Sequence, residues 1–179
     1  MSDQFEVLKR ENVSTKNQQV FDQIKSLLGA VPNLYSTLAY SENALEAYFR
    51  LETSPNSLSA REVAIVNLVV SEINNCMYSL SVFTMIAKQS GFTEEQTIEI
   101  RSGCASFDTQ LDALIKLTRE LSRKKNIETQ QLLDAFYMAG YTKENLMDII
   151  ILIGDRTISN LLHTVTRVPI EFPLAKTID

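Results

Sequence analysis

The sequence predicts an all-α protein. Apolar residues recur at helical spacing from Asn17 onward, no stretch alternates apolar and polar residues long enough to favour a strand, and glycine and proline are rare. The chain of 179 residues contains 5 glycines and 4 prolines, and 45% of its residues are apolar. This composition excludes a disordered chain and provides enough apolar material for a compact core. We expect residues 1–13, which are polar and mixed, to form an N-terminal arm, and residues 14–179 to form a single domain.

The first predicted helices are short and end at loop-forming residues. Residues 17–28 have apolar side chains at helical spacing, and Gly29 follows where a glycine commonly ends a helix. Pro32 suits the first position of a short helix, and Ser41 can cap the helix after it. Residues 53–57, with the sequence Thr-Ser-Pro-Asn-Ser, form the clearest loop in the chain.

The element that follows this loop is predicted to lie at the centre of the fold. Ser59 and Glu62 have the spacing of a capping box, which marks the start of a helix. Because no glycine or proline follows until Gly91, the pattern predicts one helix of about 30 residues, straight or kinked. Its middle, residues 63–70, is apolar nearly all round, which indicates burial on several sides.

A short pattern occurs twice and predicts two similar corners between helices. Residues 90–95 and 139–144 share the order small residue, glycine, aromatic, threonine, any residue, glutamate. In each case we expect the glycine to end one helix, the aromatic ring to fold back on it, and the threonine to cap the next helix. Asp108 can cap a helix between the two corners, and further helices are expected over about 129–139 and 143–165.

Charge and residue counts exclude several classes of protein. The chain has 17 lysine and arginine residues against 22 aspartate and glutamate residues, a net charge of −5. With only one basic run, Arg123-Lys124-Lys125, this argues against nucleic-acid binding. The N-terminus lacks a secretory signal pattern, and the longest apolar run, 149–153, is far too short to span a bilayer. We therefore expect a cytoplasmic protein without a membrane partner. A single histidine excludes a histidine-rich metal site, so we expect neither metal nor cofactor.

The candidate chemistry lies midway along the predicted central helix. Glu72, Cys76 and Ser79 share one helix face, because steps of three and four residues return to the same side. A carboxylate one turn from a thiol could accept its proton, although two negative charges would then repel each other. Alternatively, Cys76 is a small buried apolar residue and Glu72 lies at a helix or subunit boundary. His163, the only histidine, is a further candidate, although a histidine near a helix end equally suits a structural role.

Several separate segments match the pattern of one known family. They are Leu58-Ser59-x-Arg61-Glu62, Ser71-Glu72-x-Asn74-x-Cys76-x-Tyr78, Ala87 with Gly91, Val31-Pro32-Asn33, Ala139-Gly140-Tyr141-Thr142-x-Glu144-x-Leu146, and Asn160 with His163 before a proline. In order and spacing, these segments resemble the carboxymuconolactone decarboxylase and alkylhydroperoxidase D (AhpD) family, especially its peroxidase-related branch. The resemblance covers about residues 30–170. It implies an AhpD-like helical bundle around a long central helix, assembled as trimers or trimers of dimers.

The resemblance also implies a catalytic motif that this chain only partly retains. Peroxidase members carry Cys-x-x-Cys-x-x-x-His, in which the second cysteine attacks the peroxide, the first resolves it as a disulfide, and the histidine relays a proton with a glutamate. Cys76 matches the first cysteine, whereas Ser79 and Phe83 occupy the positions of the second cysteine and the histidine. A serine hydroxyl is too weakly acidic to replace a thiolate, and a phenyl ring cannot carry a proton. The decarboxylase branch of the family carries a pattern similar to Glu-Leu-x-x-His at this place, and Ser79 and Phe83 do not match that pattern either.

Three functions follow as hypotheses. The first is a family member whose antioxidant alkylhydroperoxidase site is disabled by Ser79 and Phe83. The second is a thiol-dependent peroxidase or oxidoreductase that uses Cys76 alone, with Glu72 or His163 as helper and an external thiol as reductant. The third is a small-molecule binding module with an apolar pocket, although the same pattern is typical of a core. The residues that would line this pocket are Met77, Leu80, Phe83 and Met85.

Two further expectations concern Cys104 and assembly. Cys104 lies 104 − 76 = 28 residues beyond Cys76, and its approach to Cys76 is not forbidden, although a disulfide would need Cα atoms within about 7 Å. We expect Cys104 to be a buried turn residue instead. The central helix is too apolar around its circumference to be covered by one small domain. We therefore expect a homo-oligomer.

Overall fold

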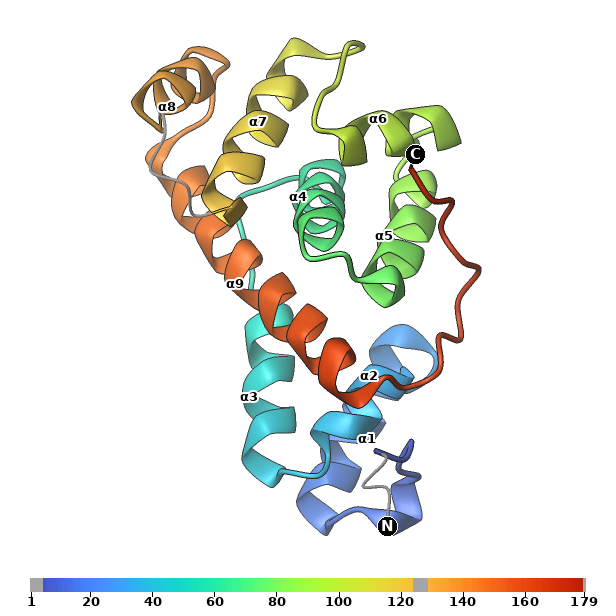
Figure 1. The fold of residues 1–179 in the computed structure, drawn as a ribbon. Helices are drawn as coiled ribbons and strands as arrows, with labels where there is room; N and C mark the ends of the chain where they lie inside the picture. The colour runs from blue at the N-terminus through green and yellow to red at the C-terminus, as the bar shows by residue number, and fades with distance from the viewer. Residues whose placement is uncertain (1–4, 124–128, 179) are drawn as a thin grey trace. The chain divides into compact units, whose positions relative to one another are not determined.

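The computed structural model describes residues 5–123 and 129–178, and within them the chain is all-α, as predicted (Figure 1). No strand occurs among these residues, and Lys124 and Lys125 of the basic run lie outside them, as do residues 1–4 of the expected arm. In chain order the elements are the 3-10 turn η1 (Arg10–Asn12) and the helices α1 (Thr15–Leu28), α2 (Asn33–Leu38), α3 (Glu42–Glu52), α4 (Ala60–Ile73), α5 (Met77–Gln89), α6 (Glu94–Ser102), α7 (Thr109–Arg123), α8 (Thr129–Met138) and α9 (Lys143–Thr166). None of the helices within the described ranges is both long and apolar enough to cross a membrane.

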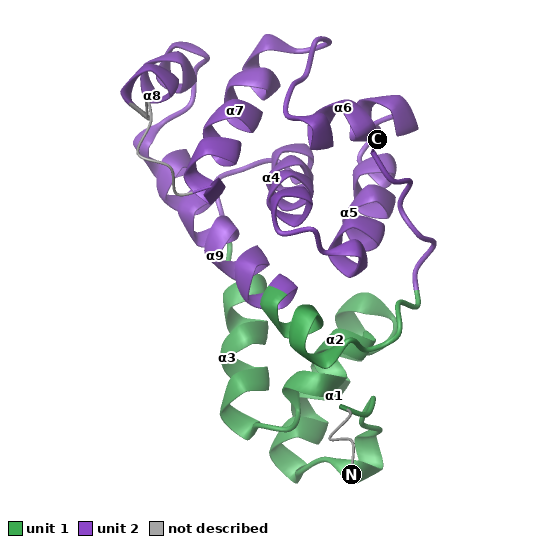
Figure 2. Ribbon diagram, in the orientation of Figure 1, with its two compact units in different colours: residues 1–55, 161–171 green, residues 56–160, 172–179 purple. Residues whose placement is uncertain are grey.

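The chain divides into two compact units (Figure 2). Unit 1 comprises Met1–Pro55 with Leu161–Glu171, and unit 2 comprises Asn56–Asn160 with Phe172–Asp179. Each unit has its own cluster of buried apolar side chains. The motif residues Glu72, Cys76, Ser79 and Phe83 belong to unit 2, whereas His163 belongs to unit 1.

Unit 1 is built on α1, α2 and α3, and the local signals in the sequence explain its helix ends. Ser14 caps α1 by accepting a hydrogen bond from the backbone N–H of Asn17, and Gly29 ends α1 in the left-handed region at φ 82°. Pro32 is the cap of α2 rather than its first helical residue, and Ser41 caps α3 as predicted. The core of this unit contains Val20, Phe21, Ile24, Tyr35, Leu38, Ala39, Leu45 and Tyr48.

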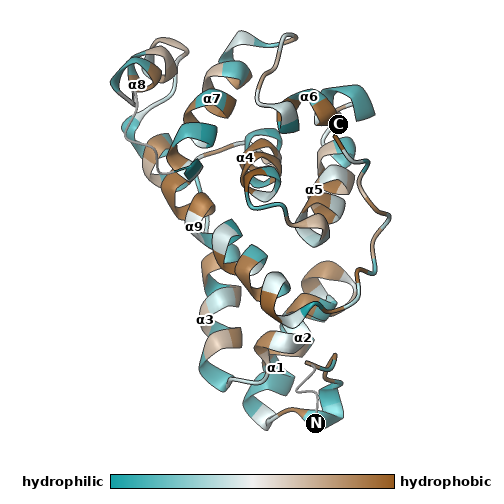
Figure 3. Cartoon of the chain, in the orientation of Figure 1, coloured by the Kyte–Doolittle hydropathy of each residue, from teal (hydrophilic) through white to brown (hydrophobic). Residues whose placement is uncertain are grey.

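Unit 2 is centred on α4, which packs against α5, α6 and α7. The predicted capping box is present, with Ser59 and Glu62 each bonding to the backbone N–H of the other. Ile65, Val66, Leu68 and Val70 are fully buried, so the prediction of a helix covered on several sides is confirmed. Figure 3 shows the corresponding concentration of apolar residues on α4.

The prediction of one continuous central helix is wrong, because the chain breaks after α4. Asn74 ends α4, Asn75 adopts a left-handed conformation at φ 51°, and Cys76 starts the separate helix α5 in an extended conformation at φ −101°. Asparagine tolerates the left-handed region better than other residues with side chains, so the break needs no glycine or proline. Positions 72 and 76 therefore do not share the face of one helix.

The two predicted corners between helices are confirmed. Gly91 and Gly140 have φ values of 91° and 100°, and the aromatic residues that follow them, Phe92 and Tyr141, are buried in the core of unit 2. The hydroxyl of each corner threonine accepts a hydrogen bond from a backbone N–H of the next helix, and the threonine's own backbone N–H donates to a side-chain oxygen of that helix. The pairs are Thr93 with Gln96 and Thr142 with Asn145.

Candidate functional site

Cys76 and Ser79 meet at the start of α5, as their spacing predicts. The Cys76 side chain is buried, and its Sγ lies 3.6 Å from Oγ of the fully buried Ser79. The backbone N–H of Cys76 donates to the carbonyl oxygen of Ser71 at 3.0 Å, and the carbonyl oxygen of Cys76 accepts from Leu80 at 2.9 Å. The thiol thus lies at the positive end of a helix dipole, which favours a thiolate, while burial of the side chain acts in the opposite direction.

Phe83, at the position of the family's histidine, covers a buried cation. The guanidinium of Arg156 from α9 lies 4.1 Å from the centre of the Phe83 ring. Arg156 donates to Oδ1 of Asn67 at 2.9 Å, to Oγ of Ser159 at 2.9 Å and to Oδ2 of Asp155 at 3.2 Å. All of these residues are buried. This position therefore holds a ring packed on a polar cluster and no group that can move a proton.

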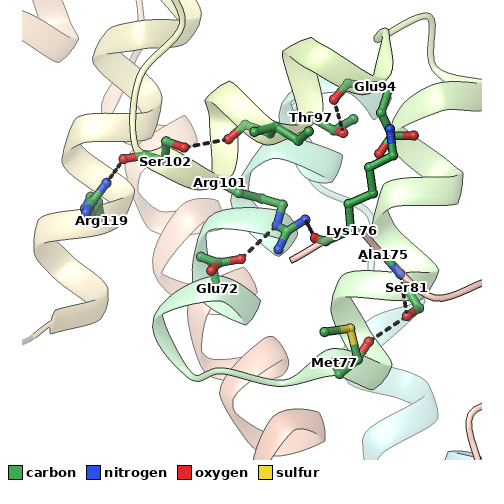
Figure 4. Close-up of polar contacts among 11 residues, drawn as sticks. Glu72, Met77, Ser81, Glu94, Thr97, Arg101, Ser102, Arg119, Ala175 and Lys176 are labelled. Atoms are coloured by element: carbon green, nitrogen blue, oxygen red, sulfur yellow. Dashed lines mark hydrogen bonds and ion pairs between the residues drawn. The ribbon is translucent and has the colours of Figure 1, made fainter. Parts of the chain in front are cut away.

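Glu72 is paired with an arginine from another helix. Its Oε2 accepts a bond from Nε of Arg101 in α6 at 2.7 Å, and Nη1 of Arg101 donates to the backbone oxygen of Lys176 at 2.6 Å (Figure 4). The Arg101 side chain is only 2% exposed, whereas that of Glu72 is 29% exposed. The single helix face from which a Glu72–Cys76 contact was predicted does not exist, and the Glu72 carboxylate pairs with the buried Arg101. A role of Glu72 at Cys76 stays a prediction.

His163 lies near the end of α9, in unit 1, and contacts the turn that follows the helix. Its Nε2 lies 3.2 Å from the backbone oxygen of Val168, and its own backbone oxygen accepts from the N–H of Arg167, which has a left-handed φ of 50°. These contacts give the ring a structural role in the turn that follows the helix. Its assistance to Cys76 stays a prediction.

Cys104 is exposed, so the expectation of a buried turn residue is wrong. The residue follows Gly103, which ends α6 at φ 102°, and the turn toward α7 leaves the thiol accessible to solvent. Its Sγ lies 3.9 Å from the backbone oxygen of Glu99. Cys76 and Cys104 are not joined by a disulfide in this structure.

Three of the four residues in the apolar stripe that suggested a ligand pocket lie in the core or pack against it. Leu80 and Phe83 belong to the main buried cluster of unit 2, and Met77 packs against it. Among the residues that the structure describes, no three histidine, cysteine, aspartate or glutamate side chains gather in a way that could hold a metal ion.

Two features of the site carried too little sequence signal to predict. The first is the Asp155–Arg156 cluster, whose only trace is a pair of charges directly after the apolar run 149–153. The second is the C-terminal segment, which lies along α5: the Phe172 ring meets the Tyr78 ring edge-on at 5.7 Å, and the N–H of Ala175 donates to Oγ of Ser81 at 3.2 Å.

The comparison with protein families identifies the segment that contains this site. Residues 40–120 match the carboxymuconolactone decarboxylase family, and this range includes α4, α5 and the Cys76 motif. This match confirms, for residues 40–120, the resemblance to the carboxymuconolactone decarboxylase family that was drawn from the sequence. No curated protein matches the sequence.

Solved structures show the same AhpD-like fold. A peroxidase-related protein from Silicibacter sp. TM1040 superposes with a TM-score of 0.78 at 19% identity, covering 94% of this chain and 92% of that one. A peroxidase-related protein with an alkylhydroperoxidase AhpD core, from Ralstonia eutropha JMP134, superposes with a TM-score of 0.79 at 17% identity, covering 90% of this chain and 88% of that one. The debrominase Bmp8 superposes with a TM-score of 0.76 at 18% identity, covering 96% of this chain and 94% of that one. A cysteine-to-alanine variant of Bmp8 has been crystallised with 2,3,4-tribromopyrrole.

Proposed function

We propose that this protein is an AhpD-like family member that lacks the family's dithiol alkylhydroperoxidase activity. One observation carries the proposal: the positions that resemble the peroxide-attacking cysteine and the proton-carrying histidine hold Ser79 and Phe83. Both side chains are buried within unit 2, Ser79 against the Cys76 thiol and Phe83 against the Arg156 guanidinium. Neither can take over the chemistry of the group that it replaces.

The electron balance of the family reaction supports the same conclusion. Peroxide reduction in the family ends with a disulfide between the two motif cysteines, so it needs two sulfur atoms within bonding reach. At the start of α5 the Cys76 sulfur faces an oxygen, Oγ of Ser79, with which no disulfide can form. The other cysteine, Cys104, forms no disulfide and lies in the turn after α6, where its Sγ is 3.9 Å from the backbone oxygen of Glu99.

We expect the wild-type protein to show no turnover of cumene hydroperoxide with dithiothreitol above the level of a Cys76→Ser variant. Ser79→Cys rebuilds the Cys-x-x-Cys pair, and Ser79→Cys with Phe83→His rebuilds the whole motif, so measurable turnover is expected from these variants alone. Consumption of hydroperoxide, followed in a coupled assay, is the measurement. Cys104→Ser is the matched control and should behave as wild type. Robust wild-type turnover that Cys76→Ser abolishes would contradict the proposal.

A second candidate function, single-cysteine redox chemistry, is favoured by the position of Cys76. The thiol lies at the first turn of α5, where the helix dipole stabilises a thiolate, and the Ser79 hydroxyl is within 3.6 Å. Peroxide would oxidise it to a sulfenic acid, and an external thiol would reduce it again. The debrominase Bmp8, whose cysteine-to-alanine variant was crystallised with 2,3,4-tribromopyrrole, shows that this fold can bind a small organic molecule. If this candidate is right, the wild-type protein, without Ser79→Cys, should consume cumene hydroperoxide slowly in the assay described above, and Cys76→Ser should not.

We also propose that the protein is a homo-oligomer, a trimer or a trimer of dimers, as the resemblance implies. The support lies on α9, where four apolar side chains of unit 2 are 45–54% exposed: Met147, Ile150, Ile151 and Ile158. Their spacing of three, four and seven residues gathers them on one side of the helix, and Figure 3 shows apolar residues along it. An exposed apolar face of this kind is typical of a surface that another subunit covers.

Light scattering is expected to give a mass that is a multiple of the 20.2 kDa chain. Ile151→Glu should shift the distribution toward smaller species, because it places a charge in the covered face. Leu27→Glu, at a 63% exposed position of α1, is the control and should leave the mass unchanged. A monodisperse 20.2 kDa monomer of the wild-type protein would overturn the proposal.

A further inference from the structure

A pocket of about 500 Å³ lies in unit 2, and of the four motif residues Glu72 alone lines it. It is lined by residues of α4, α6 and α7 together with one residue of the C-terminal segment, and it includes neither Cys76, Ser79 nor Phe83. Its volume falls in the usual range for sites that hold small organic molecules. The lining residues are Val69, Glu72, Ile73, Arg101, Ser102, Arg119, Arg123 and Ile178.

The charged groups of this pocket are predominantly positive. Among the residues that the structure describes, three arginines line it, and Glu72 is the one acidic residue of the lining. Glu72 forms an ion pair with the buried Arg101, whose guanidinium is also bonded to the backbone oxygen of Lys176 (Figure 4). The charge of Arg101 is therefore matched, and Arg119 and Arg123 give the pocket its net positive charge.

Arg119 is held in place at this pocket by a local feature of the backbone. Its Nη1 donates to the carbonyl oxygen of Ser102 at the end of α6 (Figure 4), where the helix dipole favours a cation. A Cβ atom at Gly103 would lie only 1.6 Å from this nitrogen, and Gly103 has the left-handed φ of 102°. The absence of a side chain at position 103 is thus what admits the guanidinium.

Arg119 and Arg123 present their charges together. They lie four residues apart on α7, so their side chains occupy the same side of the helix one turn from each other. A guanidinium carries five donors in a planar fork, and a bond to one carbonyl leaves donors that match the two oxygens of a carboxylate or phosphate. Val69, Ile73 and Ile178 supply an apolar part of the same lining.

We propose that this pocket binds a small amphipathic organic anion, with its carboxylate or phosphate group on Arg119 and Arg123 and its apolar body against Val69, Ile73 and Ile178. The proposal is independent of the state of the cysteine motif. It predicts selectivity in two directions, since an alcohol of the same length lacks the charge and inorganic phosphate lacks the apolar body.

Isothermal titration calorimetry on the full chain tests this with four probes: sodium hexanoate, hexyl phosphate, hexanol and inorganic phosphate. We expect saturable binding of hexanoate or hexyl phosphate, at least about tenfold tighter than hexanol or inorganic phosphate, and weakened by added salt. The tighter of the two anions identifies the head group. Binding of hexanol or inorganic phosphate as tight as that of the anions would overturn the proposal, as would no saturable binding of either anion.

Variants locate the site. Arg123→Gln changes an exposed residue at the end of α7 and should weaken anion binding about tenfold without unfolding the protein. Arg119→Gln should have a similar effect on binding, accompanied by a loss of stability because it removes the bond to the end of α6. Arg50→Gln, whose side chain is 79% exposed on α3, is the matched control and should bind as wild type. Anion binding that Arg123→Gln leaves unchanged would overturn the assignment.

Discussion

Replacing Arg156 by alanine is expected to lower the free energy of unfolding by about 3–5 kcal/mol, because it leaves a buried carboxylate without its cation. Asp155 is 2% exposed, and the Arg156 guanidinium lies 3.2 Å from its Oδ2. The same substitution removes the donors to Asn67 and Ser159 and the cation above the Phe83 ring. For a chain of this size the loss corresponds to a decrease of roughly 10 °C in the melting temperature.

Urea denaturation followed by circular dichroism measures this loss. The control is Arg50→Ala, which removes an arginine of the same size from an exposed position and should change stability by less than about 0.5 kcal/mol. If Arg156→Ala changed stability as little as Arg50→Ala, the cluster would not hold α9 to the core of unit 2.

The second large effect is expected at Glu72. Glu72→Ala leaves Arg101, whose side chain is 2% exposed, with a buried and unmatched charge, and should cost about 3 kcal/mol of stability. This lies at the lower end of the range for a broken buried ion pair because the Glu72 side chain is 29% exposed. Thermal unfolding gives the magnitude, with Glu46→Ala, from a pair whose side chains are 43% and 34% exposed, as the control.

The reactivity of Cys76 separates this structural role of Glu72 from a catalytic one. If Glu72 serves mainly to pair with Arg101, the rate of Cys76 alkylation against pH should be the same in wild type and in Glu72→Gln. A displaced pH profile in Glu72→Gln, without the expected loss of stability, would assign Glu72 to the thiol. Cys104→Ser should be the background for these measurements, because Cys104 is exposed and would react first.

The helices could be predicted from the sequence because their ends carry local signals. Ser14 was not singled out in advance, but Gly29, Ser41, Ser59 and the two glycine corners were, and each of these acts through contacts within a few residues. The break before Cys76 was missed because the prediction relied on glycine and proline as the only helix breakers. The signal that was present is the consecutive pair Asn74-Asn75, since asparagine adopts the left-handed conformation at low cost.

The site could be predicted only where its contacts are local. Cys76 and Ser79 meet across three residues, and such a contact follows from helical spacing alone. The partner of Glu72 is 29 residues away in α6, and that of Asn67 is 89 residues away in α9. Contacts over such separations depend on how the helices pack, which periodicity and spacing within one sequence do not determine.

The contact between Phe83 and Arg156 sets a cost in stability on introducing the Cys-x-x-Cys-x-x-x-His motif into this chain. A histidine at position 83 would forfeit the stacking on the guanidinium, and once protonated it would place a second cation about 4 Å from the first. Phe83→His on its own therefore lowers stability while restoring no nucleophile, and Ser79→Cys on its own restores a nucleophile without its proton carrier. Acquiring the whole motif therefore takes two substitutions, and it is Phe83→His that carries the cost in stability.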